Sequence, residues 1–152
     1  MSSRTNLALA PSWTQLWNGD RAVADRIVSD DFVTHLAPFT GGGTQEMRGR
    51  EALKAWIADM HRAFADLRFT IDVGPISDDD HLVIRWGARG VYAGGFPGTS
   101  ASAIGKEVSF TGTDILRVSD GNVVEYWVNA DGLDLCAQLG ITELASGGES
   151  RE

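Results

Sequence analysis

The strongest constraint on this chain is a run of four strand patterns in its second half, which follows a segment of helical patterns. The strand patterns cover residues 68–76, 81–92, 107–118 and 122–130. The last two are separated by Asp120-Gly121, a dipeptide that readily adopts the positive φ angles of a tight hairpin turn. This order predicts an antiparallel meander in the second half of the fold.

Helical patterns dominate the first half of the chain. From Arg48 to Phe64 apolar residues recur with a 3.6-residue period and polar residues lie opposite, which predicts an amphipathic helix. The other expected elements are helices from Pro11 to Gly19, from Asp20 onward and over 132–139, a short strand over 31–37 and a Gly-rich loop over 38–46. Helices first and strands second imply an α+β fold in which the helices cover one face of a curved sheet.

The length and composition suit a single domain. A chain of 152 residues with 43% hydrophobic residues can bury a sizeable core, and no linker or internal repeat divides it. We expect a flexible N-terminus over residues 1–10, one domain over 11–143 and a disordered polar tail over 144–152.

Charge and cysteine content argue against several classes of function. The formal net charge is -8 and the 13 Lys and Arg residues are scattered, so nucleic acid is not an expected partner. The single cysteine, Cys136, cannot form an intramolecular disulfide, and no Cys/His cluster has the spacing of metal ligands. The apolar stretch from Leu7 to Ala10 is too short for a membrane span or a signal peptide. We therefore expect a cytoplasmic protein with no bound metal and no membrane association.

Asp114 is the most unusual polar residue of the strand patterns, because it shares a strand face with Phe110, Gly112 and Leu116. A carboxylate among apolar neighbours must find hydrogen-bond partners or have a raised pKa, and enzymes prepare acids and bases in both ways. The alternative is a structural carboxylate that is tied to a neighbouring side chain, such as His35 or an indole N–H. The sequence leaves both interpretations open.

The last strand places Trp127, Asn129 and Asp131 on one face, and this mixture of polar and apolar side chains resembles a pocket wall. Asp131 also directly precedes the last predicted helix, where Asp is a favoured N-cap residue. From the residues alone, a structural cap is the favoured interpretation of Asp131.

His35 lies in the short first strand, just before the Gly-rich loop. An imidazole there could transfer protons near neutral pH or orient a carboxylate, although a lone His is more often a hydrogen-bonded core residue. Aromatic side chains are numerous for a core of this size and suit a flat apolar ligand, although most of them could equally belong to the core. The residues expected to line such a pocket are Trp13, Trp17, Phe39, Trp56, Trp86, Tyr92, Phe110, Trp127 and Asn129.

Several short motifs match one known family. They are Trp17-Asn18-Gly19-Asp20, Asp31-Phe32-Val33 with His35, Gly49-Arg50-Glu51-Ala52, Phe64-Ala65-Asp66-Leu67, Phe110-Thr111-Gly112-Thr113-Asp114, Arg117 with Asp120-Gly121, Glu125-Tyr126-Trp127 and Gln138-Leu139-Gly140. With these motifs the chain resembles the SnoaL-like polyketide cyclases of the nuclear-transport-factor-2-like (NTF2-like) superfamily over nearly its whole length.

The resemblance implies a cone-shaped, curved antiparallel sheet with N-terminal helices covering its concave face, the cystatin-like α+β barrel of NTF2-like proteins. It also implies a homodimer formed through the outer face of the sheet. The implied chemistry is an intramolecular aldol condensation that closes the last ring of an aromatic polyketide without metal or organic cofactor. The family's acid/base aspartate corresponds to Asp131, a first-strand His corresponds to His35, and a pocket position that is often His is Asp114 here.

The leading hypothesis is a cofactor-independent cyclase or isomerase that acts on a small hydrophobic, polyketide-like molecule. Asp131 would remove a proton α to a carbonyl, and His35 or a protonated Asp114 would hydrogen-bond the enolate. One alternative is a non-catalytic binding protein for a hydrophobic metabolite, in which Asp131 is a helix cap only. Another is an interaction module that uses the outer face of the sheet.

Overall fold

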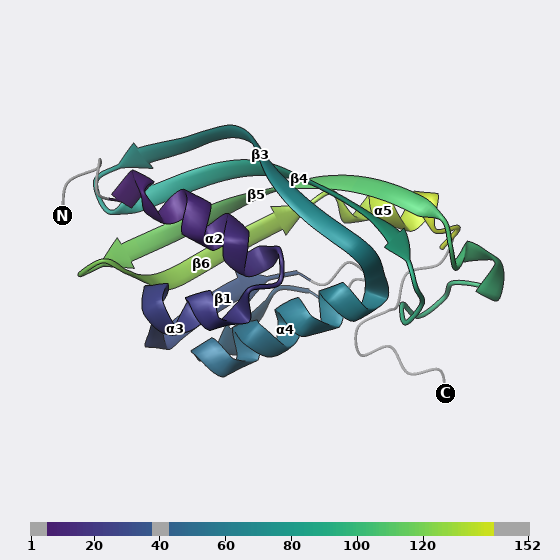
Figure 1. The fold of residues 1–152 in the computed structure, drawn as a ribbon, viewed down its shortest axis with the longest axis horizontal. Coiled ribbons are helices and arrows are strands. Elements are labelled where there is room, and N and C mark those ends of the chain that lie inside the picture. The colour runs from purple at the N-terminus through teal and green to yellow at the C-terminus, as the bar shows by residue number, and fades with distance from the viewer. Residues whose placement is uncertain (1–5, 38–42, 142–152) are drawn as a thin grey trace.

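The structure is a computed structural model that describes residues 6–37 and 43–141 (Figure 1). Its helices are α2 (Leu9–Trp17), α3 (Ala24–Ile27), α4 (Arg50–Ala63) and α5 (Gly132–Gln138), with short 3-10 helices at Arg21–Val23 and Ala101–Ala103. Its strands are β1 (Val28–Leu36), β2 (Gln45–Arg48), β3 (Phe64–Asp78), β4 (His81–Tyr92), β5 (Glu107–Ser119) and β6 (Asn122–Ala130). The long amphipathic helix and the four consecutive strands lie where the sequence predicts them.

The strands form one curved, open sheet in the order β2-β1-β6-β5-β4-β3. The predicted α+β fold is therefore confirmed. One pair departs from the antiparallel pattern, because β1 and β6 pair in parallel, for example through Thr34 and Tyr126. No hairpin joins these two strands, since the chain leaves β1 through β2 and α4 before it reaches the meander of β3 to β6.

The helices are unevenly distributed over the sheet. Figure 1 shows α2, α3 and α4 grouped on one side, with β3 and β4 curving past them, while α5 lies at the far end of the sheet and packs on β5. Within the described residues, no helix is both long and apolar enough to cross a bilayer. The space between the helical layer and the inner face of the sheet holds the core.

Strict alternation in β4 and β5 defines the inner face of the sheet. In β4 the buried residues include Leu82, Ile84 and Trp86, and in β5 they include Phe110 and Asp114. This pattern confirms the face that the sequence predicts for Asp114. In the part of the chain that the structure describes, Asp114 is the only charged residue that is buried.

Two local expectations need correction. The flexible N-terminus predicted over 1–10 is wrong for residues 6–10, because α2 begins before Pro11 and Ala10 is fully buried with Trp13 on one side of the helix. The loop predicted over 38–46 contains the start of β2, a short polar strand that pairs with β1 and has no alternation to reveal it. Residues 1–5 and the tail predicted over 144–152 lie outside the described residues.

Candidate functional site

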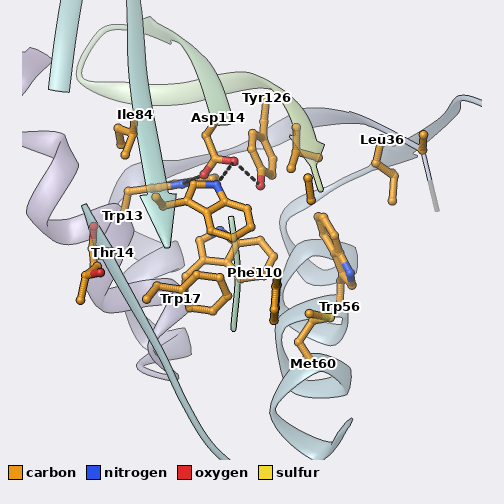
Figure 2. A pocket seen from close by; sticks show the side chains of 16 residues that line it. Trp13, Thr14, Trp17, Leu36, Trp56, Met60, Ile84, Phe110, Asp114 and Tyr126 are labelled. Atoms are coloured by element: carbon orange, nitrogen blue, oxygen red, sulfur yellow. Dashed lines mark hydrogen bonds between the residues drawn. The ribbon is translucent and has the colours of Figure 1, made fainter. Parts of the chain in front are cut away.

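A cavity of about 50 Å³ lies between α2, α4 and the inner face of the sheet, with the Asp114 carboxylate in its wall (Figure 2). Most of the wall is apolar and includes Leu36, Met60, Phe69, Ile84, Phe110, Val128 and Ala130. A cavity of this volume holds a few water molecules. A ligand of polyketide size therefore requires partly exposed side chains of the wall, such as Trp56, to move outward.

Three hydrogen-bond donors surround the carboxylate of Asp114. Trp13 Nε1 donates to Oδ2 at 2.9 Å, and Trp86 Nε1 donates to Oδ1 at 2.9 Å. The phenol of Tyr126 donates to the same Oδ1 at 3.1 Å. An ionised carboxylate offers about four acceptor positions, so these donors leave one position free, on Oδ2. Of the alternatives that the sequence left open for a structural partner, the structure shows an indole N–H and not His35.

The pKa of Asp114 is determined by two opposing influences. Burial away from water is the larger one and raises the pKa from 3.8 to about 6. The hydrogen bonds from Trp13, Trp86 and Tyr126 act in the opposite direction, because they stabilise the charged form. At neutral pH Asp114 is mostly ionised, yet it is close enough to its pKa to take up and release a proton.

Tyr126 stays a donor throughout this range. Its pKa is raised well above 10.0 by burial and by the neighbouring Asp114 carboxylate. The ring also contacts the edge of Trp13, with 4.9 Å between ring centroids, so the phenol and the indole are held together beside the carboxylate.

Gly112 makes room for one of the two indole donors. It pairs with Trp86 across β5 and β4, and a Cβ atom at this position would lie only 2.2 Å from Cζ2 of the Trp86 ring. The ring therefore lies directly over the glycine, and its N–H reaches Asp114 further along β5. A side chain at position 112 would force the Trp86 ring away from the carboxylate.

The structure brings together many of the residues predicted to line a pocket. Trp13, Trp17, Trp56, Trp86, Phe110 and Asp114 all line the cavity. Tyr92 is buried but lies outside the cavity wall, where its hydroxyl contacts Thr99 Oγ1 and accepts a hydrogen bond from the Phe96 backbone N–H. Phe39 lies outside the described residues.

The face predicted to be a pocket wall in the last strand is the wrong one. Tyr126, Val128 and Ala130 line the cavity, whereas Trp127 and Asn129 alternate onto the outer face of the sheet. An irregularity in the pairing of β5 with β6, between Arg117 and Val118, changes the burial alternation near the start of β6. Tyr126 belongs to the more apolar of the two sets of alternate residues in this strand, and that apolar character is the sequence signal for the inner face. The prediction instead takes the set with mixed polar and apolar side chains as the pocket wall.

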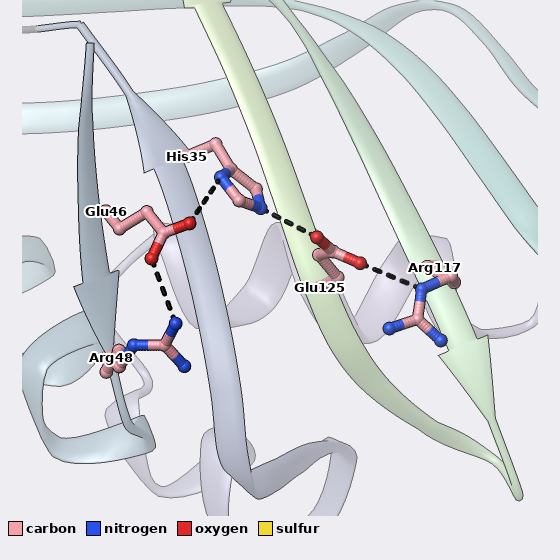
Figure 3. A network of polar contacts seen from close by, with 5 residues as sticks. All are labelled: His35, Glu46, Arg48, Arg117 and Glu125. Atoms are coloured by element: carbon pink, nitrogen blue, oxygen red, sulfur yellow. Dashed lines mark hydrogen bonds and ion pairs between the residues drawn. The ribbon is translucent and has the colours of Figure 1, made fainter.

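His35 is also on the outer face, in a chain of polar contacts with Glu46, Glu125 and Arg117 (Figure 3). Its Nε2 lies 2.7 Å from Glu125 Oε2, and its ring stacks on Trp127 with 5.3 Å between centroids. Burial raises the pKa of Glu125, but the hydrogen bonds from His35 and Arg117 outweigh it and lower the pKa overall. The prediction that His35 shares a pocket with Asp114 is therefore wrong, because alternation along β1 turns Leu36 inward and His35 outward.

Asp131 follows β6 and is half exposed. Its carboxylate accepts hydrogen bonds from Thr111 Oγ1 and from Arg85 Nη2, the latter at 3.4 Å. Asp131 occupies the N-cap position of α5, but its side chain makes no capping hydrogen bond. The prediction that Asp131 faces the same pocket as Asp114 is wrong, because its partners Thr111 and Arg85 belong to the outer face of the sheet.

The cavity offers little to a metal ion. Across residues 6–37 and 43–141 no group of three or more His, Cys, Asp or Glu side chains converges on a common point. Among the described residues that line the cavity, Asp114 has no second carboxylate or imidazole beside it. Among the described lining residues, the titratable chemistry near Asp114 is one carboxylate and its uncharged donors, and the hydroxyls of Thr14 and Thr70 are bonded to Ala10 and Asp72.

The fold and cavity together define a class of protein, in which a curved sheet and a helical layer enclose one mostly apolar site. The model of the SnoaL-like polyketide cyclase family matches residues 8–139, and the chain belongs to this family. No curated protein matches the chain in sequence.

Solved structures agree with this assignment. The structure of TsrD from Streptomyces laurentii has a TM-score of 0.77 and 25% identity, over 93% of this chain and 98% of that chain. Wild-type IdmH from Streptomyces antibioticus, described as a candidate polyketide cyclase, has a TM-score of 0.72 and 26% identity, over 91% and 98%. A Catenulispora acidiphila protein with a ketosteroid isomerase-like fold is 17% identical, with a TM-score of 0.68 over 88% and 92%, and shows the fold alone.

Proposed function

We propose that the protein is a cyclase or isomerase that transfers protons at carbon atoms next to a carbonyl group, with Asp114 as its acid/base. The observation that carries this proposal is a single carboxylate, buried in an apolar cavity wall, whose pKa is raised to about 6. Membership of the SnoaL-like family supports a polyketide-like substrate. In this proposal Asp114 has the acid/base role that the family resemblance implies for Asp131.

The first step uses the acceptor position that the three donors leave free. Asp114 Oδ2 takes a proton from the carbon α to the carbonyl, and the electron pair of that C–H bond becomes part of an enolate. Asp114 is buried in a mostly apolar wall, so the carboxylate is less solvated and more basic than it is in water. Proton transfer by a positioned side chain contributes roughly 10²- to 10⁴-fold to the rate.

The second step returns the proton, so no proton is gained or lost overall. In an isomerisation the protonated Asp114 delivers it to another carbon atom of the same substrate. In a cyclisation the enolate carbon attacks a second carbonyl carbon of the substrate, and Asp114 delivers the proton to the alkoxide oxygen that forms. Trp13, Trp86 and Tyr126 hold the carboxylate in one orientation during both transfers.

A small ketone tests the proposal without knowledge of the natural substrate. The bicyclic ketone 1-tetralone carries exchangeable hydrogens at C2, next to its carbonyl. We expect the protein to accelerate exchange of these hydrogens for deuterium in D2O, as measured by the loss of the C2 proton signal in NMR. Asp114→Asn should lower this acceleration by roughly 10²- to 10⁴-fold.

Asp131→Asn is the matched variant for this test, because it makes the same chemical change at the position that the family resemblance favours. Retained exchange in Asp131→Asn and lost exchange in Asp114→Asn would support the proposal. The reverse result would contradict it. Binding of 1-tetralone without any exchange would favour the non-catalytic binding protein, and thermal unfolding of each variant shows whether a loss reflects misfolding.

A further inference from the structure

The indole N–H of Trp17 is a buried donor for which residues 6–37 and 43–141 provide no acceptor. Trp17 is 6% exposed and lines the cavity, and its Nε1 has no hydrogen-bond partner within the described residues. A buried donor left unpaired loses its hydrogen bond to water and gains nothing in return, so such groups are rare in folded proteins. Because Trp17 lines the cavity, a bound ligand that displaces the neighbouring side chains can supply the acceptor that this donor lacks.

Trp17 differs from the other tryptophans of the cavity in the hydrogen bonding and burial of its indole N–H. Trp13 and Trp86 each donate their N–H to Asp114 at 2.9 Å. Trp56 also lines the cavity but is only partly buried. Trp17 is therefore the one cavity indole, among the described residues, whose nitrogen is both buried and unpaired.

The position of Trp17 is fixed by contacts on both its backbone and its ring. Its carbonyl oxygen accepts a hydrogen bond from His61 Nε2 at 2.8 Å. The next residue, Asn18, is bonded twice to the backbone of Phe69, at 2.7 and 3.2 Å. The ring meets Trp56 edge to face, with 4.9 Å between centroids. The backbone of Trp17 is therefore held in place, so its N–H needs little reorientation of its own once Trp56 moves outward to admit a ligand.

We propose that Trp17 Nε1–H donates a hydrogen bond to the carbonyl or enolate oxygen of the bound ligand and so selects oxygenated over purely hydrocarbon molecules. The inference rests on the proposed function, because it takes the same cavity as the ligand site. It assigns the donor role that the sequence had given to His35 or to protonated Asp114. In this arrangement Trp17 binds the oxygen atom of the ligand and Asp114 transfers the proton.

The test compares two probes of nearly equal shape, 1-tetralone and tetralin, of which only the first carries an oxygen atom. Trp17→Phe removes the N–H and keeps an aromatic ring. We expect its affinity for 1-tetralone to fall by roughly five- to tenfold, which is the value of one neutral hydrogen bond, and its affinity for tetralin to stay unchanged. Ligand-observed NMR titrations measure both affinities.

A second variant guards against a folding defect. Replacement of Trp17 by β-(3-benzothienyl)alanine keeps the bicyclic shape and puts a sulfur atom in place of the N–H, and it should show the same selective loss. Trp127→Phe makes the Trp-to-Phe change on the outer face, and the wild-type preference for the ketone should persist there.

Three results of these titrations would overturn the inference. An equal loss of affinity for both probes would mean that Trp17 acts through packing alone. Unchanged affinity for 1-tetralone would mean that the N–H is satisfied otherwise, for example on the ring face of Trp56. Failure of the wild type to bind either probe would overturn the inference together with the proposed function.

Deuterium exchange separates the two proposals. If exchange requires Asp114 but the preference for the ketone is the same in Trp17→Phe as in the wild type, only the inference about Trp17 is overturned. A ketone preference that depends on Trp17, in a protein without any exchange, would support the inference and overturn the acid/base proposal.

Discussion

Asp114 and Glu125 lie on the neighbouring strands β5 and β6, but they face opposite sides of the sheet and are held in opposite ways. Asp114 accepts hydrogen bonds from uncharged groups only, inside an apolar wall, and its pKa is raised to about 6. Glu125 is bonded to His35 and Arg117 near the surface, and its pKa is lowered.

The difference shows how the choice of partners determines what a carboxylate can do. A cationic partner stabilises the charged form and makes the carboxylate a poor base. Uncharged donors orient the carboxylate but offset only part of the free-energy cost of removing its charge from water. The pKa of a buried carboxylate with such partners therefore stays raised, and the carboxylate stays basic. The inner face therefore holds a carboxylate with a raised pKa, as the proposed proton transfer requires, and the outer face uses one for cross-strand contacts.

The largest effect expected on stability concerns the pH dependence of Asp114. The folded protein holds a proton at Asp114 more tightly than the unfolded chain does, so this stabilisation is complete below pH 3.8 and is lost as the pH rises through about 6. The free energy of unfolding of the wild type should thus fall over this window by on the order of 3 kcal/mol more than that of Asp114→Asn. Urea unfolding at a series of pH values measures the free energy of unfolding of both proteins. If the two free energies change with pH in parallel, the raised pKa of Asp114 is contradicted.

The next effect compares two glycines on opposite faces of the sheet. Gly112→Ala forces Trp86 off its position and should cost about 1–3 kcal/mol of stability. Gly87→Ala is the matched control, because its Cβ would approach only the exposed side chain of Asp72, with 2.8 Å to Oδ2, and that side chain can move. Its cost should stay within about 0.5 kcal/mol. Equal losses in chemical denaturation would show that the position of the Trp86 ring does not depend on Gly112.

The smallest effect is expected on the outer face. Glu125→Gln weakens its contacts with His35 and Arg117, and because these groups are partly exposed the loss should stay below about 1 kcal/mol. The stabilisation by Glu125 is present above its unfolded pKa of 4.5 and lost as the pH falls, which is the opposite slope to that of Asp114. Exchange of 1-tetralone should be unchanged in Glu125→Gln, and a large loss of exchange would break the distinction between the two faces.

Alternation was a reliable guide where the strands are regular. In β4 and β5 the period of two correctly placed Trp86, Phe110 and Asp114 on the inner face. It failed in β6, where an irregular pairing disturbs the alternation and a mixed set of side chains looked like a pocket wall. The sequence also does not predict the burial of Asn6 and Ala10, because burial depends on distant parts of the chain, as the bond from Asn6 to the Asp79 carbonyl shows.

In the candidate site, too, local sequence patterns predict some features, and contacts between distant residues determine the others. The helical spacing of Trp13 and Trp17 and the apolar surroundings of Asp114 are local properties, and they were sufficient to name these residues as candidates. The chain by itself determined the α+β architecture and the family motifs, because hydrophobic periodicity and turn residues act over short distances.

Only the tertiary structure decided which carboxylate enters the cavity and which donors meet it. The bond from Trp13 to Asp114 joins residues separated by 101 positions, and no local pattern predicts such a contact. The same packing directs His35 and Asp131 outward and leaves the Trp17 N–H buried, with no acceptor in the described part of the chain. Burial and pKa depend on everything that surrounds a group in three dimensions, so they become defined only when the helical layer closes over the sheet.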